Sequence, residues 1–406
     1  MNDELVPHRG RVVLCTLRYS DNLGDGVIGD CMEFLIKKQR PGFDVEHLDM
    51  AGRAGFSAPK ESRLGYLRKI LFYACPVPMR GTAFRLLWPL LFEKRMAHAC
   101  GHAFRENVDA LVFGGGQMLN DVALNFPLKF QYVAKYASQR RTSMAMAGVG
   151  VSSNWSKRGL DCFRGALSSP LFKYVSVRDE RSRNTLTSYL ESRTSEVAVT
   201  LDPAIWSSEA YKVVPREKSV DVLRVGFGIA NPEELATQAQ GENFSAASFD
   251  SFWLDVIDGV KSLNCKIVLF SNGAVEDDTY LRQFAAKLKS VRPDVLFEVL
   301  PRAERPHELV SQIAGMDVIV AHRLHANIIA YSCSVPSIAL VWDAKVAGFC
   351  DMVGRSRWCY HSLTDGARVA ADVEQAYKTG VDLDQQQKLK SICLSKIEDM
   401  LGAVGK

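Results

Sequence analysis

Short apolar runs alternate along the chain with longer segments whose apolar positions repeat every three or four residues. The short runs predict buried strands, and the longer segments predict helices. In the first half, strands are predicted at 11–17, 43–48, 108–113, 142–147, 174–177 and 196–200. In the second half, they are predicted at 223–229, 266–271, 295–299, 318–320 and 337–342. Strands that alternate with helices predict parallel sheets covered by helices on both faces.

A polar stretch at 207–221 separates the two runs of strand–helix alternation. The pattern therefore predicts an N-terminal Rossmann-like α/β domain at 1–206 and a second one at 207–370. Residues 371–406 are predicted as a helical tail that returns to the first domain. A chain of 406 residues is long enough for two hydrophobic cores.

Composition excludes several classes of protein. Hydrophobic residues make up 47% and charged residues 24%, as in soluble globular proteins, and no apolar run is long enough to span a membrane. The net charge of +4 is too small to predict nucleic-acid binding. The ten cysteines form no CxxC pair and the N-terminus is polar, so we expect reduced thiols in a cytoplasmic protein. No cluster of residues has the spacing of a metal site.

One segment, 51–95, is unusually basic, with nine basic and two acidic side chains interleaved with aromatic and aliphatic residues. Basic amphipathic segments of this kind suit peripheral binding to an anionic membrane, here expected at the inner face of the plasma membrane. The alternative is that these helices pack on the first domain and expose a solvated basic face. The sequence leaves both interpretations open.

The strand predicted at 318–320 is followed by Arg323, His325 and Asn327, and the run from His325 onward predicts a helix. Alternate spacing after a strand suggests that the three side chains reach one spot. Ligands bind where strands meet helices in open α/β sheets, because the helix N-terminus offers unpaired N–H groups and a partial positive charge. The cluster therefore predicts an anion site.

Two glycine-rich loops follow predicted strands of the first domain. Asn22, Gly24 and Asp25 come after the first strand, and Gly114, Gly115 and Gly116 come after the third. Glycines there allow backbone N–H groups to approach a ligand, and Asp25 can cap the following helix. A single loop of this kind is weak evidence, but two on one sheet are more than turns require.

Together these segments resemble the polysaccharide pyruvyl transferase family. The resemblance rests on motifs in the family's order: Asn22-Leu23-Gly24-Asp25, Phe113 to Gly116, Gly148-Val149-Gly150-Val151, Ser176-Val177-Arg178-Asp179-Glu180, Asp202-Pro203-Ala204, Arg323-Leu324-His325-Ala326 and Trp342 to Phe349. Arg-Leu-His-Ala is the most specific of them. One departure is the run Cys333-Ser334-Val335-Pro336, where the family usually has glycine before Val-Pro; this alters the turn and leaves the chemical groups in place.

The resemblance implies two domains like those of GT-B glycosyltransferases, with the active site in the cleft that they face. The implied reaction moves a pyruvyl group from phosphoenolpyruvate onto two hydroxyls of a sugar, in a polysaccharide repeat unit or a lipid-linked oligosaccharide, and needs no cofactor. Arg178, Arg323 and His325 are the implied catalytic residues. The donor would be bound by the two arginines with Asn22, Gly24, Asp25, Gly114, Gly115, Gly116, Leu324 and Asn327.

The residues suit this chemistry. The planar fork of an arginine binds a carboxylate or phosphate bidentately, and an imidazolium can protonate the donor methylene near neutral pH. Since these groups are expected to line a cleft, their replacement is expected to affect activity and not folding. Asp202, Asp343 and Lys345 are candidates for binding the acceptor or supporting the site. Asp202 could equally shape a turn, and Asp343 and Lys345 could form a structural pair.

Two other functions fit parts of the pattern. A GT-B glycosyltransferase that uses a nucleotide sugar would need a nucleotide-binding carboxylate late in the second domain, and the order of motifs argues against it. A non-catalytic carbohydrate-binding relative is a third interpretation, against which the intact Arg178, Arg323 and His325 argue.

Overall fold

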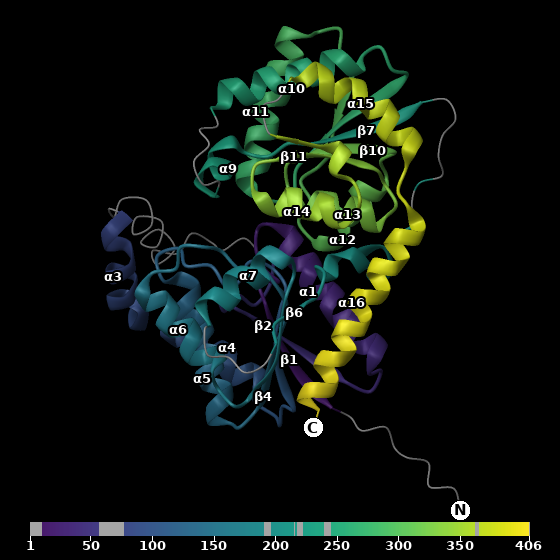
Figure 1. Ribbon diagram of the computed structural model, residues 1–406. Coiled ribbons are helices and arrows are strands. Elements are labelled where there is room, and N and C mark those ends of the chain that lie inside the picture. Colours follow the sequence, from purple (N-terminus) through teal and green to yellow (C-terminus); the bar gives the residue numbers. More distant parts are fainter. Residues whose placement is uncertain are drawn as a thin grey trace, which may run out of the picture. The chain divides into compact units, whose positions relative to one another are not determined.

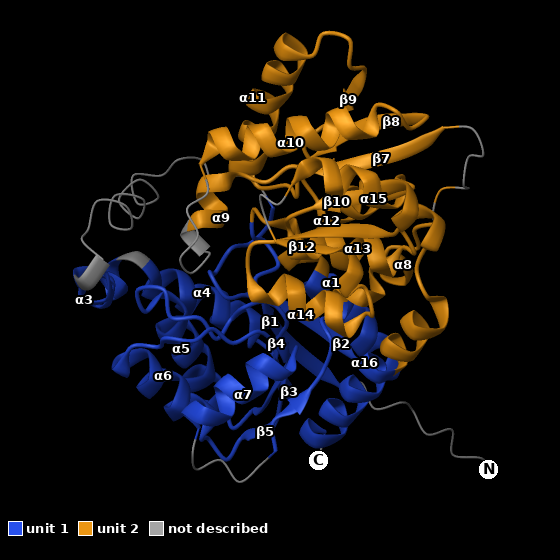
Figure 2. Ribbon diagram, turned by 45° about the horizontal axis from the view of Figure 1, so that its top comes forward, with its two compact units in different colours: residues 1–20, 28–203, 392–406 blue, residues 21–27, 204–391 orange. Residues whose placement is uncertain are grey.

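The computed structural model describes residues 10–56, 77–190, 196–214, 216, 222–238, 245–361 and 365–405, which fold into two compact units (Figure 2). Unit 1 comprises residues 1–20, 28–203 and 392–406, and unit 2 comprises residues 21–27 and 204–391. The change of unit after residue 203 lies close to the predicted boundary at 206. Residues 21–27 differ from the prediction, because they pack with unit 2.

Unit 1 is built on a parallel sheet whose strand order is β2-β1-β3-β4-β5-β6 (Figure 1). Its strands are β1 (Arg11–Thr16), β2 (Asp44–Asp49), β3 (Ala110–Gly114), β4 (Ser143–Val149), β5 (Phe172–Val177) and β6 (Ala198–Val199). Every residue of β1 and β3 is buried, as expected of central strands covered on both faces. The predicted strands of the first half are thus all present.

Helices flank this sheet, and aromatic rings fill the core. The helices are α1 (Leu23–Gln39), α3 (Val77–Trp88), the π-helix η1 (Pro89–Glu93), α4 (Lys94–Ala103), α5 (Asn125–Gln139), α6 (Lys157–Leu167) and α7 (Glu180–Tyr189). Phe113 of β3 stacks on Phe130 of α5 with 4.2 Å between ring centroids. The predicted basic insertion is helical from residue 77 onward; its residues 57–76 lie outside the described residues.

Unit 2 carries the second parallel sheet, ordered β12-β11-β10-β7-β8-β9. Its strands are β7 (Leu223–Gly228), β8 (Cys265–Phe270), β9 (Phe297–Val299), β10 (Val318–Ala321), β11 (Ser337–Val341) and β12 (Cys359–His361). The chain moves outward in one direction from β7 to β9 and in the other from β10 to β12. The topological switch point therefore lies between β7 and β10, where open α/β sheets bind ligands at the carboxyl ends of their strands.

The helices of unit 2 cover both faces of this sheet. They are η2 (Pro203–Trp206), which begins at the last residue of unit 1, α8 (Ser207–Ala210), α9 (Pro232–Gln238), α10 (Ala246–Val260), α11 (Val275–Val291), α12 (Pro306–Ala314), α13 (Leu324–Ser332), α14 (Ala344–Met352), η3 (Ser356–Trp358), α15 (Gly366–Thr379) and α16 (Leu383–Val404). Figure 1 shows α10 and α15 over one face and α12, α13 and α14 over the other. Two α/β units with parallel sheets are confirmed.

The C-terminal segment differs from the predicted single tail. It forms two helices, α15 and α16, that are separated at Gly380, where φ is +70°. This left-handed conformation favours glycine and ends a helix. Helix α15 packs against α10 within unit 2, and α16 is divided between the units after Ser391. Strand β12 was not predicted, because its three residues are too few to give a periodic pattern.

Candidate functional site

The most distinctive polar cluster of unit 2 lies at the junction of β10 and α13, as the sequence predicted. Strand β10 ends at Ala321, and Arg323 is the N-cap residue of α13 with extended backbone angles. His322, Arg323 and His325 are all buried, with exposed fractions of 0%, 9% and 8%. The junction is at the topological switch point of the sheet, so its position is that of a ligand site.

Arg323 forms an ion pair with a carboxylate of helix α11. Its Nε donates to Oδ2 of Asp277 at 2.9 Å, and its Nη2 donates to Oδ1 at 2.7 Å. Asp277 lies in the first turn of α11, is 0% exposed, and also accepts a hydrogen bond from the backbone N–H of Asn231 at 2.8 Å. Burial opposes the charge of Arg323, but Asp277, with smaller effects of Glu234 and Asp25, raises the pKa of Arg323.

His325 packs against the loop after β1. A Cβ atom at position 24 would overlap with Nδ1 and Cβ of His325, so only glycine fits there. The sequence assigned Gly24 to backbone contact with a ligand, whereas in the structure the imidazole occupies the space that the missing side chain leaves. Asp25 lies in the first turn of α1. Residues 21–27 and His325 belong to the same unit, which brings these predicted residues together.

A hydrogen bond between two side-chain amides joins the loop after β1 to the loop after β8. Asn272 donates through Nδ2 to Oδ1 of Asn22 at 2.6 Å, and the backbone N–H of Leu23 donates to the carbonyl of Asn272 at 3.4 Å. The next residue, Gly273, has a φ of +94°, and a Cβ atom added there would lie 2.5 Å from the side chain of Leu23, so glycine is favoured at this position. Asn22 is therefore engaged with the loop after β8, and its predicted contact with a donor stays a prediction.

Asn327 makes contacts with its own junction. Its Nδ2 donates to the carbonyls of Ala321 and Arg323 at 3.2 and 3.0 Å, and the residue is 0% exposed. The strand-like alternation from which Arg323, His325 and Asn327 were expected to reach one spot is absent. The chain is helical from Leu324, so alternate residues are rotated by about 200° and not aligned as in a strand. Leu324 itself is 6% exposed.

In unit 1, Arg178 occupies the N-terminal end of α7. Its Nε donates to Oδ2 of Asp179 at 3.2 Å, and Asp179 caps α7 by accepting from the N–H of Ser182 at 2.7 Å. Arg178 is 8% exposed. A Cβ atom at position 150 would lie 2.7 Å from the guanidinium carbon of Arg178, so Gly150 leaves room for this side chain.

The second glycine loop joins the ends of β3 and β4. Gly115 and Gly116 have φ of +60° and +67°, which favours glycine. The N–H of Gly150 donates to the carbonyl of Gly116 at 2.7 Å. Gly114 closes β3, where an added Cβ would lie 3.0 Å from Leu14. Asp202 of the same unit is 8% exposed.

Asp343 and Lys345 lie at the start of α14. Asp343 is the N-cap, and its Oδ1 accepts from the backbone N–H of Lys345 at 2.8 Å. The two side chains form an ion pair at 3.8 Å, and Nζ of Lys345 lies 4.2 Å from the centroid of a Trp342 ring. The structural pair anticipated from the sequence is present, and a part in acceptor binding stays a prediction.

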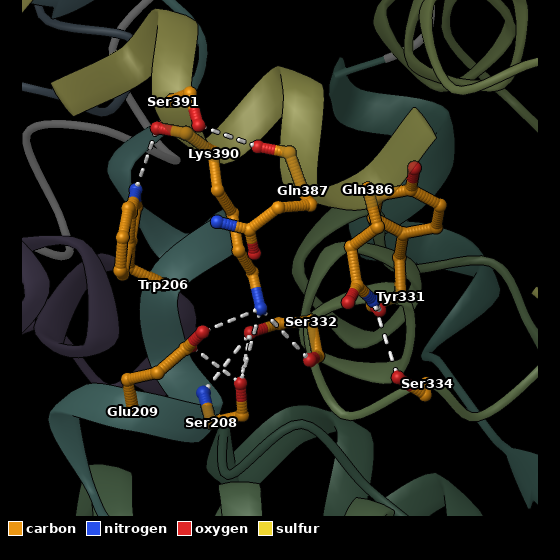
Figure 3. Close-up of polar contacts among 10 residues, drawn as sticks. All are labelled: Trp206, Ser208, Glu209, Tyr331, Ser332, Ser334, Gln386, Gln387, Lys390 and Ser391. Carbon is orange, nitrogen blue, oxygen red and sulfur yellow. Dashed lines mark hydrogen bonds and ion pairs between the residues drawn. The ribbon is translucent and has the colours of Figure 1, made fainter. Parts of the chain in front are cut away.

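The C-terminal end of α13 is anchored by α16 (Figure 3). Lys390 is 3% exposed, and its Nζ forms an ion pair with Glu209 at 2.8 Å and donates to the carbonyl of Ser332 at 3.4 Å. Gln386 donates to the carbonyl of Tyr331. A lysine beside the last carbonyls of a helix is favoured by the helix dipole. The helix that carries His325 is thus held at both ends.

Sequence reasoning missed several residues of this region. Asp277, Asn272 and His322 were not among the candidate site residues. His322 stacks on Phe249 at 4.8 Å, and neither ring nitrogen has a partner among the described residues. Burial and then Arg323 lower the pKa of His322 to about 3. Within the described parts of the chain, no group of three or more His, Cys, Asp or Glu is arranged to hold a metal.

Comparisons with known protein families and solved structures give a family and a fold for this chain. A family model described as polysaccharide pyruvyl transferase matches residues 22–344. A protein assigned as UDP-N-acetylglucosamine 2-epimerase from Listeria monocytogenes has a TM-score of 0.57 at 9% identity, covering 97% of this chain and 95% of that one. The Neisseria meningitidis UDP-GlcNAc 2-epimerase bound to UDP-GlcNAc has 0.53 at 9% identity, covering 97% and 99%. No curated protein matches the chain. These likenesses show the two-domain GT-B-like α/β fold.

Proposed function

Since the chain belongs to the polysaccharide pyruvyl transferase family, we propose that it moves a pyruvyl group from phosphoenolpyruvate onto a sugar of a polysaccharide repeat unit or a lipid-linked oligosaccharide. Two hydroxyls of one sugar add to C2 of the donor, and the C2–O bond to phosphate breaks. One hydroxyl proton ends on the methylene carbon, which becomes a methyl group, and the other leaves with phosphate. The products are a cyclic pyruvate ketal and inorganic phosphate.

The observation that carries the proposal is Arg323, which Asp277 fixes at the switch point of unit 2, two residues before His325. The donor has a carboxylate and a phosphate, and the guanidinium keeps three of its five N–H groups for an anion after pairing with Asp277. His325 is proposed to give its proton to the donor methylene, which turns C2 into an electrophile that a sugar hydroxyl attacks. Arg178 of unit 1 is proposed as a second cation for the donor.

The remaining predicted residues have supporting parts in the proposal. Gly114, Gly115 and Gly116 are proposed to lie against the donor, because a glycine loop at the carboxyl end of a strand allows a ligand to approach the backbone. Asp202, Asp343 and Lys345 are proposed to bind the acceptor, since carboxylates accept hydrogen bonds from sugar hydroxyls. No metal or cofactor enters this reaction scheme, because the two arginines are proposed to supply the positive charge that a metal would otherwise provide.

The test compares variants of the three central residues for donor binding and phosphate release. His325→Gln should retain phosphoenolpyruvate binding and lose turnover by about 10² to 10⁴. Arg178→Ala should weaken binding, at about 1.5–3 kcal/mol per charge-assisted hydrogen bond. Arg323→Lys is preferred to alanine, because alanine would leave the buried Asp277 without its counterion. Calorimetry with phosphoenolpyruvate, a phosphate assay with lipid-linked glycans and a melting curve give the three readouts.

Two outcomes would contradict the proposal. A fully active His325→Gln protein would remove histidine from the mechanism. Binding of a UDP-sugar, with no phosphate released from phosphoenolpyruvate by the wild type, would favour a nucleotide-sugar enzyme.

We also propose that helix α3 and η1 contact an anionic membrane, because a lipid-linked acceptor would be presented there. Three large apolar side chains lie at helical spacing on one exposed face: Met79 is 62% exposed, Leu86 is 74% exposed and Leu90 is 68% exposed. Arg85 and Lys94 are exposed beside them. Apolar anchors with flanking cations suit an anionic interface, at about 1 kcal/mol per basic residue near the surface. The proposed location is the cytoplasmic face of the plasma membrane. Among the described helices, none is long and apolar enough to cross a bilayer.

Co-sedimentation with vesicles tests this surface. At low salt, the wild type should co-sediment with vesicles that contain phosphatidylglycerol. The bound fraction of the protein should fall as the salt concentration rises. Leu86→Glu/Leu90→Glu should lose binding. Leu296→Glu is the control, because Leu296 is 89% exposed on unit 2. Equal recovery of the wild type with neutral and anionic vesicles would refute the membrane contact.

A further inference from the structure

Three segments at the carboxyl edge of the unit 2 sheet are linked to one another through Asp277. Arg323 itself follows β10, Asn231 follows β7, and Asp277 lies in the helix after β8. Asp277 connects the other two, since it accepts from Nε and Nη2 of Arg323 and from the backbone N–H of Asn231. The carboxylate is 0% exposed, so its position is fixed by packing as well as by these bonds.

The pairing with Asp277 occupies the Nε–Nη2 edge of the guanidinium and leaves the Nη1–Nη2 edge without a hydrogen bond to Asp277. Arginine has five N–H donors, and Asp277 engages one on Nε and one on Nη2. Nη1 makes no hydrogen bond to a described residue, and it is not among the buried polar atoms that lack a partner. The Arg323 side chain keeps 11% of its surface exposed. Nη1 therefore keeps some exposed surface, and it shares the remaining edge of the guanidinium with the second N–H of Nη2.

We infer that Asp277 is a positioning residue that presents the Nη1–Nη2 edge of Arg323 to the phosphate or carboxylate of phosphoenolpyruvate. The inference rests on the proposed function and adds to it a residue that acts through Arg323. An arginine that turned freely could offer either edge to an anion. With Asp277 on the Nε side, a bidentate anion has one available edge and hence one orientation. A lysine at 323 could serve Asp277 or the donor, but its point charge could not bridge both in this geometry.

The charge of Asp277 makes this role distinguishable from a purely electrostatic one. A carboxylate so close to an anion-binding arginine repels the anion, so charge alone predicts that Asp277→Asn binds the donor more tightly. Positioning predicts the opposite, because the amide loses the charge-assisted pair that fixes the guanidinium. A structural role alone predicts a lower melting temperature with unchanged donor affinity in the protein that remains folded.

The experiment measures KM and kcat for phosphoenolpyruvate with the full-length chain. Asp277→Asn should raise KM by about tenfold or more and change kcat by less than about threefold, because His325 and the acceptor site are untouched. Asp277→Glu keeps the negative charge but shifts the guanidinium, so it should also raise KM. Because it retains the counterion of Arg323, this variant tests the inference even if Asp277→Asn fails to fold. Glu276→Gln is the matched control, since Glu276 lies in the same helical turn and is exposed; its KM should equal that of the wild type.

A double-mutant comparison separates an action through Arg323 from an independent one. In an Arg323→Lys background, Asp277→Asn should change KM by less than about twofold, because the geometry it maintained is already lost. Unchanged or lower KM in folded Asp277→Asn and Asp277→Glu proteins would overturn the inference while the proposed function stood. A wild type that releases no phosphate from phosphoenolpyruvate would remove the proposed function, and this inference with it.

Discussion

Replacing His322 by phenylalanine is expected to remove much of the acid sensitivity of unit 2. His322 is fully buried against Phe249 and Trp253, and burial lowers its pKa to about 3. In the unfolded chain the imidazole titrates near 6.5. The folded state therefore binds fewer protons between these two values, so stability is complete above about pH 6.5 and falls as the pH drops towards 3.

The magnitude follows from the two pKa values. Protonation of the unfolded chain lowers the free energy of unfolding by about 2 kcal/mol between pH 7 and pH 5, approaching about 1.4 kcal/mol per pH unit below that. His322→Phe keeps an aromatic ring on Phe249 and has nothing to titrate. The difference in unfolding free energy between variant and wild type should therefore shift by about 2 kcal/mol in favour of the variant over this range.

Urea unfolding at pH 7, 6 and 5, followed by circular dichroism and tryptophan fluorescence, measures this difference. His307→Gln is the control, because it also removes one histidine, but one whose side chain is 58% exposed. The same pH dependence in His322→Phe and wild type would refute the reasoning.

Three further predictions concern other parts of the structure. Gly24→Ala should abolish most phosphate release, because its methyl group would overlap with the ring and Cβ of His325, whereas Gly165→Ala, which meets nothing within 4 Å, should be active. Phosphate release should survive chelation of divalent cations, since Arg178 and Arg323 are proposed to bind the anionic donor in place of a metal; full loss on adding EDTA with rescue by one metal would contradict this. Glu209→Ala should lower the melting temperature more than Lys390→Met, because it leaves Lys390, at 3% exposure, as an uncompensated buried charge, while Glu209 can hydrate; equal melting temperatures would contradict it.

The strands and the strand–helix junction could be predicted because their signals are local. An apolar run ending before Arg323 identified the carboxyl end of β10, and the helix after it was confirmed. The partner of Arg323 could not be found in this way. Asp277 lies 46 residues away between two other acids, and the rotation of α11 decides which of the three faces inward.

Tertiary packing also changed the expected consequences of mutation. Replacing the site residues was expected to spare folding, but the structure predicts a different outcome for Arg323. Asp277 is 0% exposed, and removal of its counterion is expected to destabilise the protein by about 3–5 kcal/mol. Gly24 was singled out from the sequence as part of a donor-binding loop, whereas the structure gives a different reason for glycine at this position, a histidine 301 residues further along the chain.

The division of the chain between the units has a consequence for dissecting the protein. Unit 2 takes seven of its residues, 21–27, from a position long before the rest of it begins at residue 204. A fragment of residues 204–391 would contain Arg323 and His325, but the amide of Asn272 would lose Asn22 and the imidazole would lose its cover at Gly24. Such a fragment could keep its sheet and still lack the surroundings of His325. Genetic exchange between relatives that cuts the chain near residue 204 would have to carry residues 21–27 with the C-terminal half to preserve them.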